Sequence, residues 1–137
     1  QGYNKVALGH HLDDAMESFF MNFFYNGTMR TMPPIYKAEN GLEVIRPLIF
    51  CRERQLRAFA DTNEINVIGD EACPGLRFDV KMPHARQSTK ELLAKLEEEN
   101  PKIFVSMKAA FSNIQLSTFF NKDDLKTIES SLEDDMI

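Results

Sequence analysis

The chain has 137 residues, of which 43% are hydrophobic and 27% are charged, and its formal net charge is −5. This composition excludes a disordered, collagen-like or coiled-coil chain, and the length suits one domain with a sizeable core. Residues 121–137 carry −4 of the net charge, because they hold six acidic and two basic side chains. The first 120 residues carry only −1, which leaves them free to present a basic face.

The first half of the chain has the pattern of alternating strands and helices. Residues 5–8 form an apolar run that is typical of a buried parallel strand, and residues 12–26 have the apolar spacing of an amphipathic helix. Further strands are expected at 43–50 and 65–68, with a helix at 52–63 between them. This order predicts an α/β fold with a small, partial parallel sheet of the Rossmann-like kind.

The second half is expected to be mainly helical. An irregular stretch at 69–87 leads to a capping box at 88–91, which should start a helix that runs to about residue 100. Another helix is expected from 101 to about 113, and a last one from Asp123 or Asp124. The expected parts are an α/β unit at 1–70, a loop and helical extension at 71–120 and an acidic tail at 121–137.

The densest group of polar residues lies where the first strand ends and the first helix begins. Ligands bind beside the carboxyl ends of the strands in open α/β sheets, so this position favours a site. Carboxylates there could hold Mg²⁺ beside a nucleotide phosphate, because Mg²⁺ prefers oxygen ligands. Alternatively, the acids only complement the positive end of the helix dipole. The candidate ATP and Mg²⁺ residues are Gly9, His10, His11, Asp13, Asp14 and Glu17.

Three runs carry a resemblance to a known family: GHHLDDAMESFFMNFFYNG at 9–27, RTMPP at 30–34 and VIRPLIFCRE at 44–53. They resemble the N-type ATP pyrophosphatases, or PP-loop superfamily, and within it the TtcA-like tRNA 2-thiocytidine synthetases. The resemblance implies an adenine nucleotide alpha-hydrolase-like fold and an enzyme that uses ATP to adenylate and thiolate a tRNA cytidine. It also implies a C-terminal half, inactive alone, because the family's Ser-Gly-Gly-x-Asp-Ser phosphate loop is absent from the sequence.

The two cysteines have different interpretations. Cys51 ends an expected strand and is interpreted as a small buried hydrophobic residue. Cys73 lies in the expected loop beyond the third strand, and by resemblance it matches the third protein ligand of a 4Fe–4S cluster. One cysteine cannot hold such a cluster, so the cluster is expected only on a full-length enzyme.

Two basic stretches could follow the phosphates of an RNA, although exposed arginines on a helix are often only its solvated face. The candidate tRNA-binding residues are Arg46, Arg52, Arg54, Arg57 and Arg86. Other expected partners are the N-terminal half and a second copy of the chain, because a stripe of four phenylalanines exceeds what a small sheet covers. No DNA or membrane partner is expected. Few cysteines and no signal-peptide pattern favour the cytoplasm. A lysidine synthetase-like ligase, which needs no cluster, and a non-catalytic interaction module are the alternatives.

Overall fold

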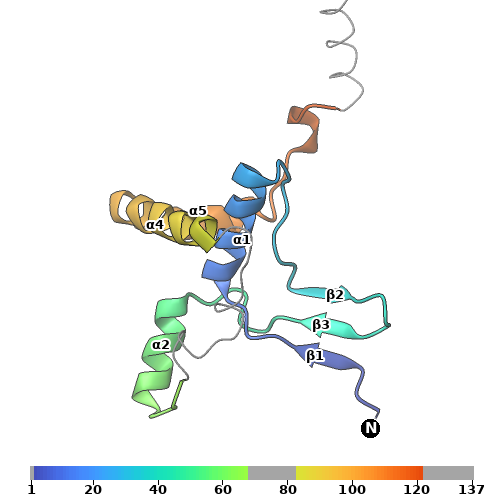
Figure 1. Ribbon diagram of the computed structural model, residues 1–137, viewed down its shortest axis with the longest axis vertical. Coiled ribbons are helices and arrows are strands. Elements are labelled where there is room, and N and C mark those ends of the chain that lie inside the picture. The colour runs from blue at the N-terminus through green and yellow to red at the C-terminus, as the bar shows by residue number, and fades with distance from the viewer. Residues whose placement is uncertain (1, 68–82, 122–137) are drawn as a thin grey trace, which may run out of the picture.

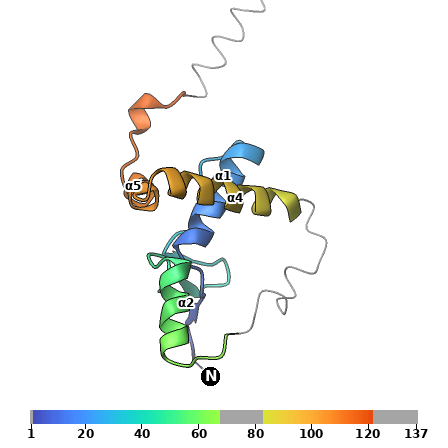
Figure 2. The same cartoon turned by 90° about the vertical axis from the view of Figure 1, so that its left-hand side faces the viewer.

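The computed structural model describes residues 2–67 and 83–121. A small sheet lies on one side of helix α1, and helices α4 and α5 lie on its other side (Figure 1). A view turned by 90° shows α4 running across α1 (Figure 2). None of the described helices is both long and apolar enough to cross a bilayer. The elements are β1 (Lys5–Ala7), α1 (Leu12–Tyr25), β2 (Ile35–Lys37), β3 (Glu43–Ile45), α2 (Glu53–Thr62), α4 (Pro83–Glu99), α5 (Ile103–Ala110) and a short 3-10 helix, η2 (Leu116–Thr118).

The sheet has the strand order β1-β3-β2 and combines one parallel with one antiparallel pair. Val6 of β1 lies opposite Val44 of the parallel strand β3, and Tyr36 of β2 faces Val44 from the antiparallel side. The parallel pair confirms the α/β class. Strand β2 is not among the elements expected from sequence, because the two prolines just before it indicate a break. Its hairpin turns at Gly41, whose φ of 84° favours glycine.

Three strand predictions need correction. The strand expected at 43–50 ends at Ile45, because Pro47 has no N–H to continue the ladder, and a turn follows. The strand expected at 65–68 is wrong for residues 65–67, which are exposed and not in a strand; Ile68 lies outside the described residues. The expected burial of the first strand is also wrong, because β1 is an edge strand whose three residues are exposed.

Helix α1 confirms the helix predicted over 12–26, and both of its ends have clear causes. His11 and Asp14 form a capping box: the His11 N–H donates to Asp14 Oδ2 (3.0 Å), and the Asp14 N–H donates to His11 Nδ1 (3.3 Å). At the other end, Gly27 has a φ of 58°, which lets the chain leave the helix.

The helical second half is confirmed, with one shifted boundary. Helix α4 begins at Pro83, five residues before the predicted capping box, since proline suits the first position of a helix. Thr89 of that box is buried inside the helix, where its hydroxyl donates to the Ala85 carbonyl (2.7 Å). Helix α5 lies within its predicted range of 101–113. The helix expected from Asp123 or Asp124 lies outside the described residues.

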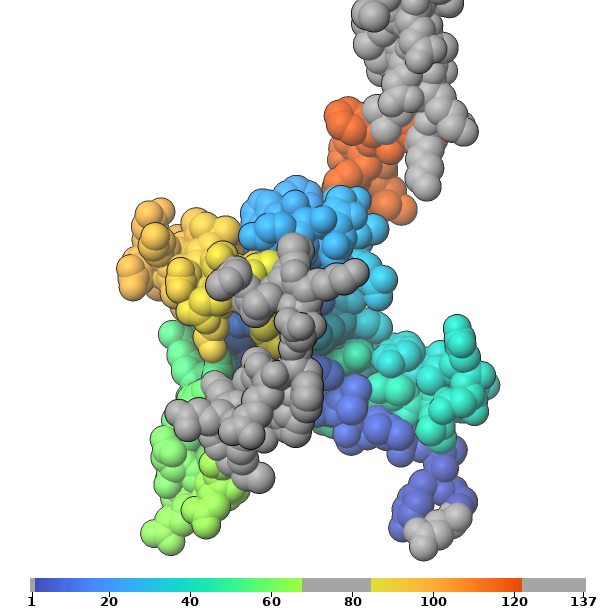
Figure 3. Space-filling model, viewed as in Figure 1, coloured from blue at the N-terminus to red at the C-terminus, as the bar shows by residue number. Residues whose placement is uncertain are grey.

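The hydrophobic core joins α1 to α4 and α5 rather than to the sheet. Its buried centre consists of Leu12 and Met16 from α1, Leu93 from α4 and Phe104 from α5. Phe20, Ile103, Met107 and Phe111 pack against this centre. The core therefore connects the predicted α/β unit with the predicted extension, and in the space-filling view the sheet stands out beside the helices (Figure 3).

Candidate functional site

The segment Gly9–His11 follows β1 at the carboxyl edge of the sheet. The Leu8 N–H donates to the Ile45 carbonyl (2.9 Å), and the Leu12 N–H donates to the Cys51 carbonyl (2.8 Å). These bonds tie the start of α1 to the chain that leaves β3. Gly9 is exposed, and within residues 2–67 and 83–121 a Cβ on it would meet nothing within 4 Å.

Asp13 joins the first turn of α1 to the start of α2. Its carboxylate accepts hydrogen bonds from Arg52 Nε (3.1 Å) and Nη2 (3.0 Å) and from the Glu53 N–H (2.8 Å). Burial alone would raise the pKa of Asp13, but the bonds from Arg52 and Glu53 outweigh it and hold the pKa below its usual value. Asp13 is therefore a charged acceptor at the amino end of α2.

Arg52 also reaches α4 and α5. It donates to both carboxylate oxygens of Glu97 (2.6 and 2.9 Å), and its guanidinium lies 3.4 Å from the centre of the Phe104 ring. The bond to Glu97 outweighs burial and, with those to Asp13, raises the pKa of Arg52. The same bond lowers the pKa of Glu97. Arg52, one of the residues predicted to bind tRNA, thus connects the two acidic residues Asp13 and Glu97 inside the fold.

Arg86 of α4 has a similar place beside the other two acids of α1. Its Nε donates to Glu17 Oε2 (2.9 Å) and its Nη2 donates to Asp14 Oδ1 (2.9 Å). Glu17 is buried, and this burial raises its pKa although Arg86 partly offsets the effect. Asp13, Asp14 and Glu17 therefore all have arginine partners.

The remaining predicted residues are more dispersed. Arg46 contacts His10, whereas Arg54 and Arg57 project from α2 with mostly exposed side chains. Arg57 pairs with Glu53 of the same helix (2.6 Å), and Arg54 lies 3.4 Å from Glu97. Cys51 is half-buried with a free thiol. Cys73 lies outside the described residues, so its role as a cluster ligand stays a prediction.

The acids of α1, as arranged here, do not suit a magnesium ion. Both oxygens of Asp13 and Asp14 accept hydrogen bonds from nitrogen donors, and two guanidinium groups would repel a divalent cation. Within residues 2–67 and 83–121, no three His, Cys, Asp or Glu side chains come together in a group that could hold a metal. The metal part of this site stays a prediction from sequence.

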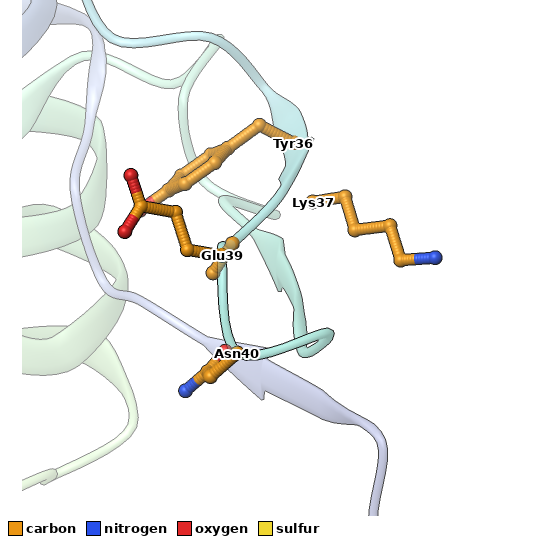
Figure 4. A pocket seen from close by; sticks show the side chains of 5 residues that line it. Tyr36, Lys37, Glu39 and Asn40 are labelled. Carbon is orange, nitrogen blue, oxygen red and sulfur yellow. The ribbon is translucent and has the colours of Figure 1, made fainter.

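A shallow hollow of about 610 Å³ lies elsewhere, along the β2–β3 hairpin. Tyr36 and Glu39 extend from one side of the hairpin, while Lys37 points the opposite way (Figure 4). In the register of the sheet, Lys37 of β2 lies opposite Glu43 of β3, and Glu43 lies opposite Lys5, the first residue of β1. The hollow is therefore at the opposite end of the sheet from Gly9–His11.

Sequence reasoning missed three contributors to the site. Glu97 and Phe104 complete the surroundings of Arg52, and Tyr36 lies under the guanidinium of Arg46 at 5.3 Å. Glu97 is one of three consecutive glutamates, and nothing local in the sequence distinguishes it from its neighbours. The other two are aromatic residues with no motif around them. Only the packing of the helices and the hairpin brings these side chains to the site.

Comparison of the sequence with known families identifies the class of the protein, and the mixed sheet agrees with it. Residues 1–82 match the profile of the PP-loop domain, and the chain belongs to this family. This confirms the family expected from the three sequence runs.

The similar curated proteins are more specific. The tRNA-cytidine(32) 2-sulfurtransferase of Coxiella burnetii (strain RSA 493 / Nine Mile phase I) is 38% identical over 124 residues, which are 90% of this chain and 46% of that protein. Proteins of the same name from Pseudomonas syringae pv. syringae and Pseudomonas putida are 37% and 36% identical, over 89% and 95% of this chain and 43% and 48% of theirs. The chain spans about half the length of the curated relatives it matches.

Proposed function

We propose that this chain is the C-terminal portion of an ATP-dependent tRNA sulfurtransferase that converts a cytidine to 2-thiocytidine. The observation that carries the proposal is the similarity to tRNA-cytidine(32) 2-sulfurtransferases along most of the chain, with Gly9–His11 at the carboxyl edge of the sheet. Nucleotides bind at that edge in open α/β folds. The same relatives favour this activity over a lysidine synthetase-like ligase.

The proposed reaction has two steps. The C2 oxygen of the cytidine attacks the α-phosphorus of ATP, and pyrophosphate leaves. A hydrosulfide-level sulfur then adds at C2, and AMP leaves with the former C2 oxygen. A 4Fe–4S cluster on the full-length enzyme would supply the sulfur, with Cys73 as one candidate ligand.

The residues of this chain have three tasks in the proposal. The nucleotide lies beside Gly9, where no described residue would contact an added Cβ within 4 Å. Asp13, Asp14 and Glu17 hold Arg52 and Arg86, and through them α4, against the start of α1. Arg54 and Arg57, which project from α2, are the candidates for contacts with tRNA phosphates.

The test is nucleoside analysis of unmodified tRNA after incubation with the full-length protein, ATP and sulfide under reducing conditions. We expect 2-thiocytidine that depends on ATP, with AMP and pyrophosphate formed in equal amounts. Lysidine formation, with lysine supplied, would favour the ligase, and an iron assay would separate the two enzymes further. No product and no ATP binding would favour the interaction module.

Residues 1–137 alone are the matched comparison for this assay. We expect no turnover from them, because the sequence has no Ser-Gly-Gly-x-Asp-Ser loop to supply the backbone N–H groups that bind pyrophosphate. Thiolation by this chain alone at ordinary concentration would contradict the proposal that the reaction needs a phosphate-binding loop from outside residues 1–137.

A further inference from the structure

The register of the parallel strands brings His10 and Arg46 together. Both strands point their carboxyl ends to the same edge, and each of the two residues follows its strand within three positions. Arg46 Nε donates a hydrogen bond to His10 Nδ1 (3.3 Å). Both side chains are half-buried. This contact lies at the edge of the sheet where the nucleotide is proposed to bind.

Arg46 is itself held by the chain that leads into β2. Its Nη1 donates to the Pro33 carbonyl (2.7 Å), its backbone N–H donates to the Pro34 carbonyl (2.8 Å), and its guanidinium lies over the Tyr36 ring (5.3 Å). The backbone bond holds the main chain of Arg46, and the two contacts to Pro33 and Tyr36 hold its guanidinium. The Nε–H that faces His10 therefore has a defined direction.

This hydrogen bond decides which nitrogen of His10 carries a proton. A ring nitrogen that accepts a hydrogen bond uses its lone pair, so the proton of the neutral ring is on Nε2. An Nε2–H group donates hydrogen bonds to anionic oxygens, and in this form it is no ligand for a metal ion. His11 is different, because its Nδ1 faces both the Asp14 N–H (3.3 Å) and the Asp14 carboxylate (3.4 Å).

We propose that Arg46 is a positioning residue that holds His10 as an Nε2–H donor for a phosphate oxygen of ATP. The inference rests on the proposed function for its ligand, but the geometry of Arg46 and His10 stands without it. Both proposed roles differ from those expected from sequence. Arg46 acts through His10 rather than on tRNA, and His10 donates a hydrogen bond to ATP rather than forming part of a magnesium site.

The first test measures the proton of His10 directly. Long-range ¹H–¹⁵N spectra of the full-length protein, labelled at histidine, distinguish the two tautomers. A His10→Gln variant identifies the signals of His10 among those of the other histidines. We expect Nε2–H in the wild type, a mixture of tautomers in Arg46→Gln, and no change at His11. A protonated Nδ1 in the wild type would overturn the inference, whatever the activity.

The second test separates ATP from tRNA. We expect Arg46→Gln to raise the KM for ATP about tenfold with a smaller change in kcat, as for a lost hydrogen bond to a charged group. Arg30→Gln, the same substitution at an exposed arginine outside the site, is the control and should leave the KM for ATP unchanged. A rise in the KM for tRNA alone would overturn the positioning role.

Two variants of His10 complete the design. The amide nitrogen of His10→Gln replaces Nε2–H as a donor, so it should keep more ATP affinity than His10→Ala. Equal losses in the two variants would contradict a donor role. If the wild type bound no ATP, the proposed function would be wrong, and so would the assignment of ATP as the ligand of His10. The tautomer spectra would still show whether Arg46 fixes the proton of His10 on Nε2.

Discussion

The two ends of helix α1 differ sharply in their surroundings. In its first half, Met16 has no exposed surface, and every carboxylate is paired with an arginine from another element. In its last turns, Phe23 and Phe24 are 47% and 52% exposed, and their rings stack on other phenylalanines of the same helix. The comparison teaches that one continuous amphipathic stripe can serve as core at one end and as open surface at the other.

The largest effect should come from Arg52, which holds the first half of α1 to α4. Arg52→Met leaves Asp13 and Glu97 without this partner, and the Arg52 side chain is only 13% exposed. We expect the free energy of unfolding to fall by about 4 kcal/mol, as when one member of a buried ion pair is removed. Urea unfolding of the full-length protein measures it.

Arg54→Met is the matched control for this change, because Arg54 reaches the same Glu97 from an exposed position. Its loss should cost less than about 1 kcal/mol. Equal costs for the two variants would show that the buried network is no stronger than a surface pair.

Met16 tests the packing in the same half of the helix. Met16→Ala opens a cavity between α1, α4 and α5, and should lower the free energy of unfolding by about 3 kcal/mol. Phe24→Ala, the same truncation in the exposed half, should cost less than about 1 kcal/mol. A larger loss from Phe24 would reverse the comparison between the two ends of the helix.

Acid should weaken the first half of α1 selectively. The pKa of Asp13 is lowered in the folded state, so its stabilisation is present above its unfolded pKa and is lost as the pH falls through the folded one. The pKa of Glu97 is also lowered, so its contribution to stability is likewise lost as the pH falls. The pKa of Glu17 is raised, so its contribution depends on pH in the opposite way. It is present below the unfolded pKa and is lost as the pH rises through the folded pKa.

Asp13→Asn should therefore flatten the fall in stability as the pH drops below 3.8, the ordinary pKa of this carboxyl group. The change in slope should be at most about 1.4 kcal/mol for each pH unit. Unfolding at a series of pH values measures this slope. An unchanged slope would mean that Asp13 does not contribute to acid sensitivity.

The capping box gives a smaller effect. Asp14→Ala removes the acceptor of the His11 N–H and one partner of Arg86, and should cost about 1 kcal/mol. Asp14→Asn keeps an oxygen that can accept from His11 and should cost less. Equal losses would show that the carboxylate charge beside Arg86 matters more than the cap.

The smallest effect on stability is expected at the exposed end of α1. Phe24→Ser should change the free energy of unfolding by less than about 0.5 kcal/mol, as for most surface positions. It should, however, reduce pairing of two copies, because exposed apolar patches favour association. Light scattering measures the pairing, and a wild type that is monomeric at high concentration would contradict it.

Much of the fold could be predicted from the sequence. The 3.6-residue period of α1, the glycine at its end and the strand before it are local signals, and the structure confirms them. The start of α4 could not be predicted, because the capping pattern at 88–91 is locally as good as a real helix start. Strand β2 is three residues long and depends on its partner β3 rather than on its own composition.

The sequence by itself determined the family, the helix that carries the polar cluster and the position of that cluster at the end of a strand. Only the tertiary structure decided what each side chain contacts. The partner of Asp13 lies 39 residues away, and Arg86 is 69 residues from Glu17. Charge alone does not assign such pairs, because any of several arginines could neutralise a given acid. Strand register and helix packing select one partner, since hydrogen bonds act only over a few ångströms.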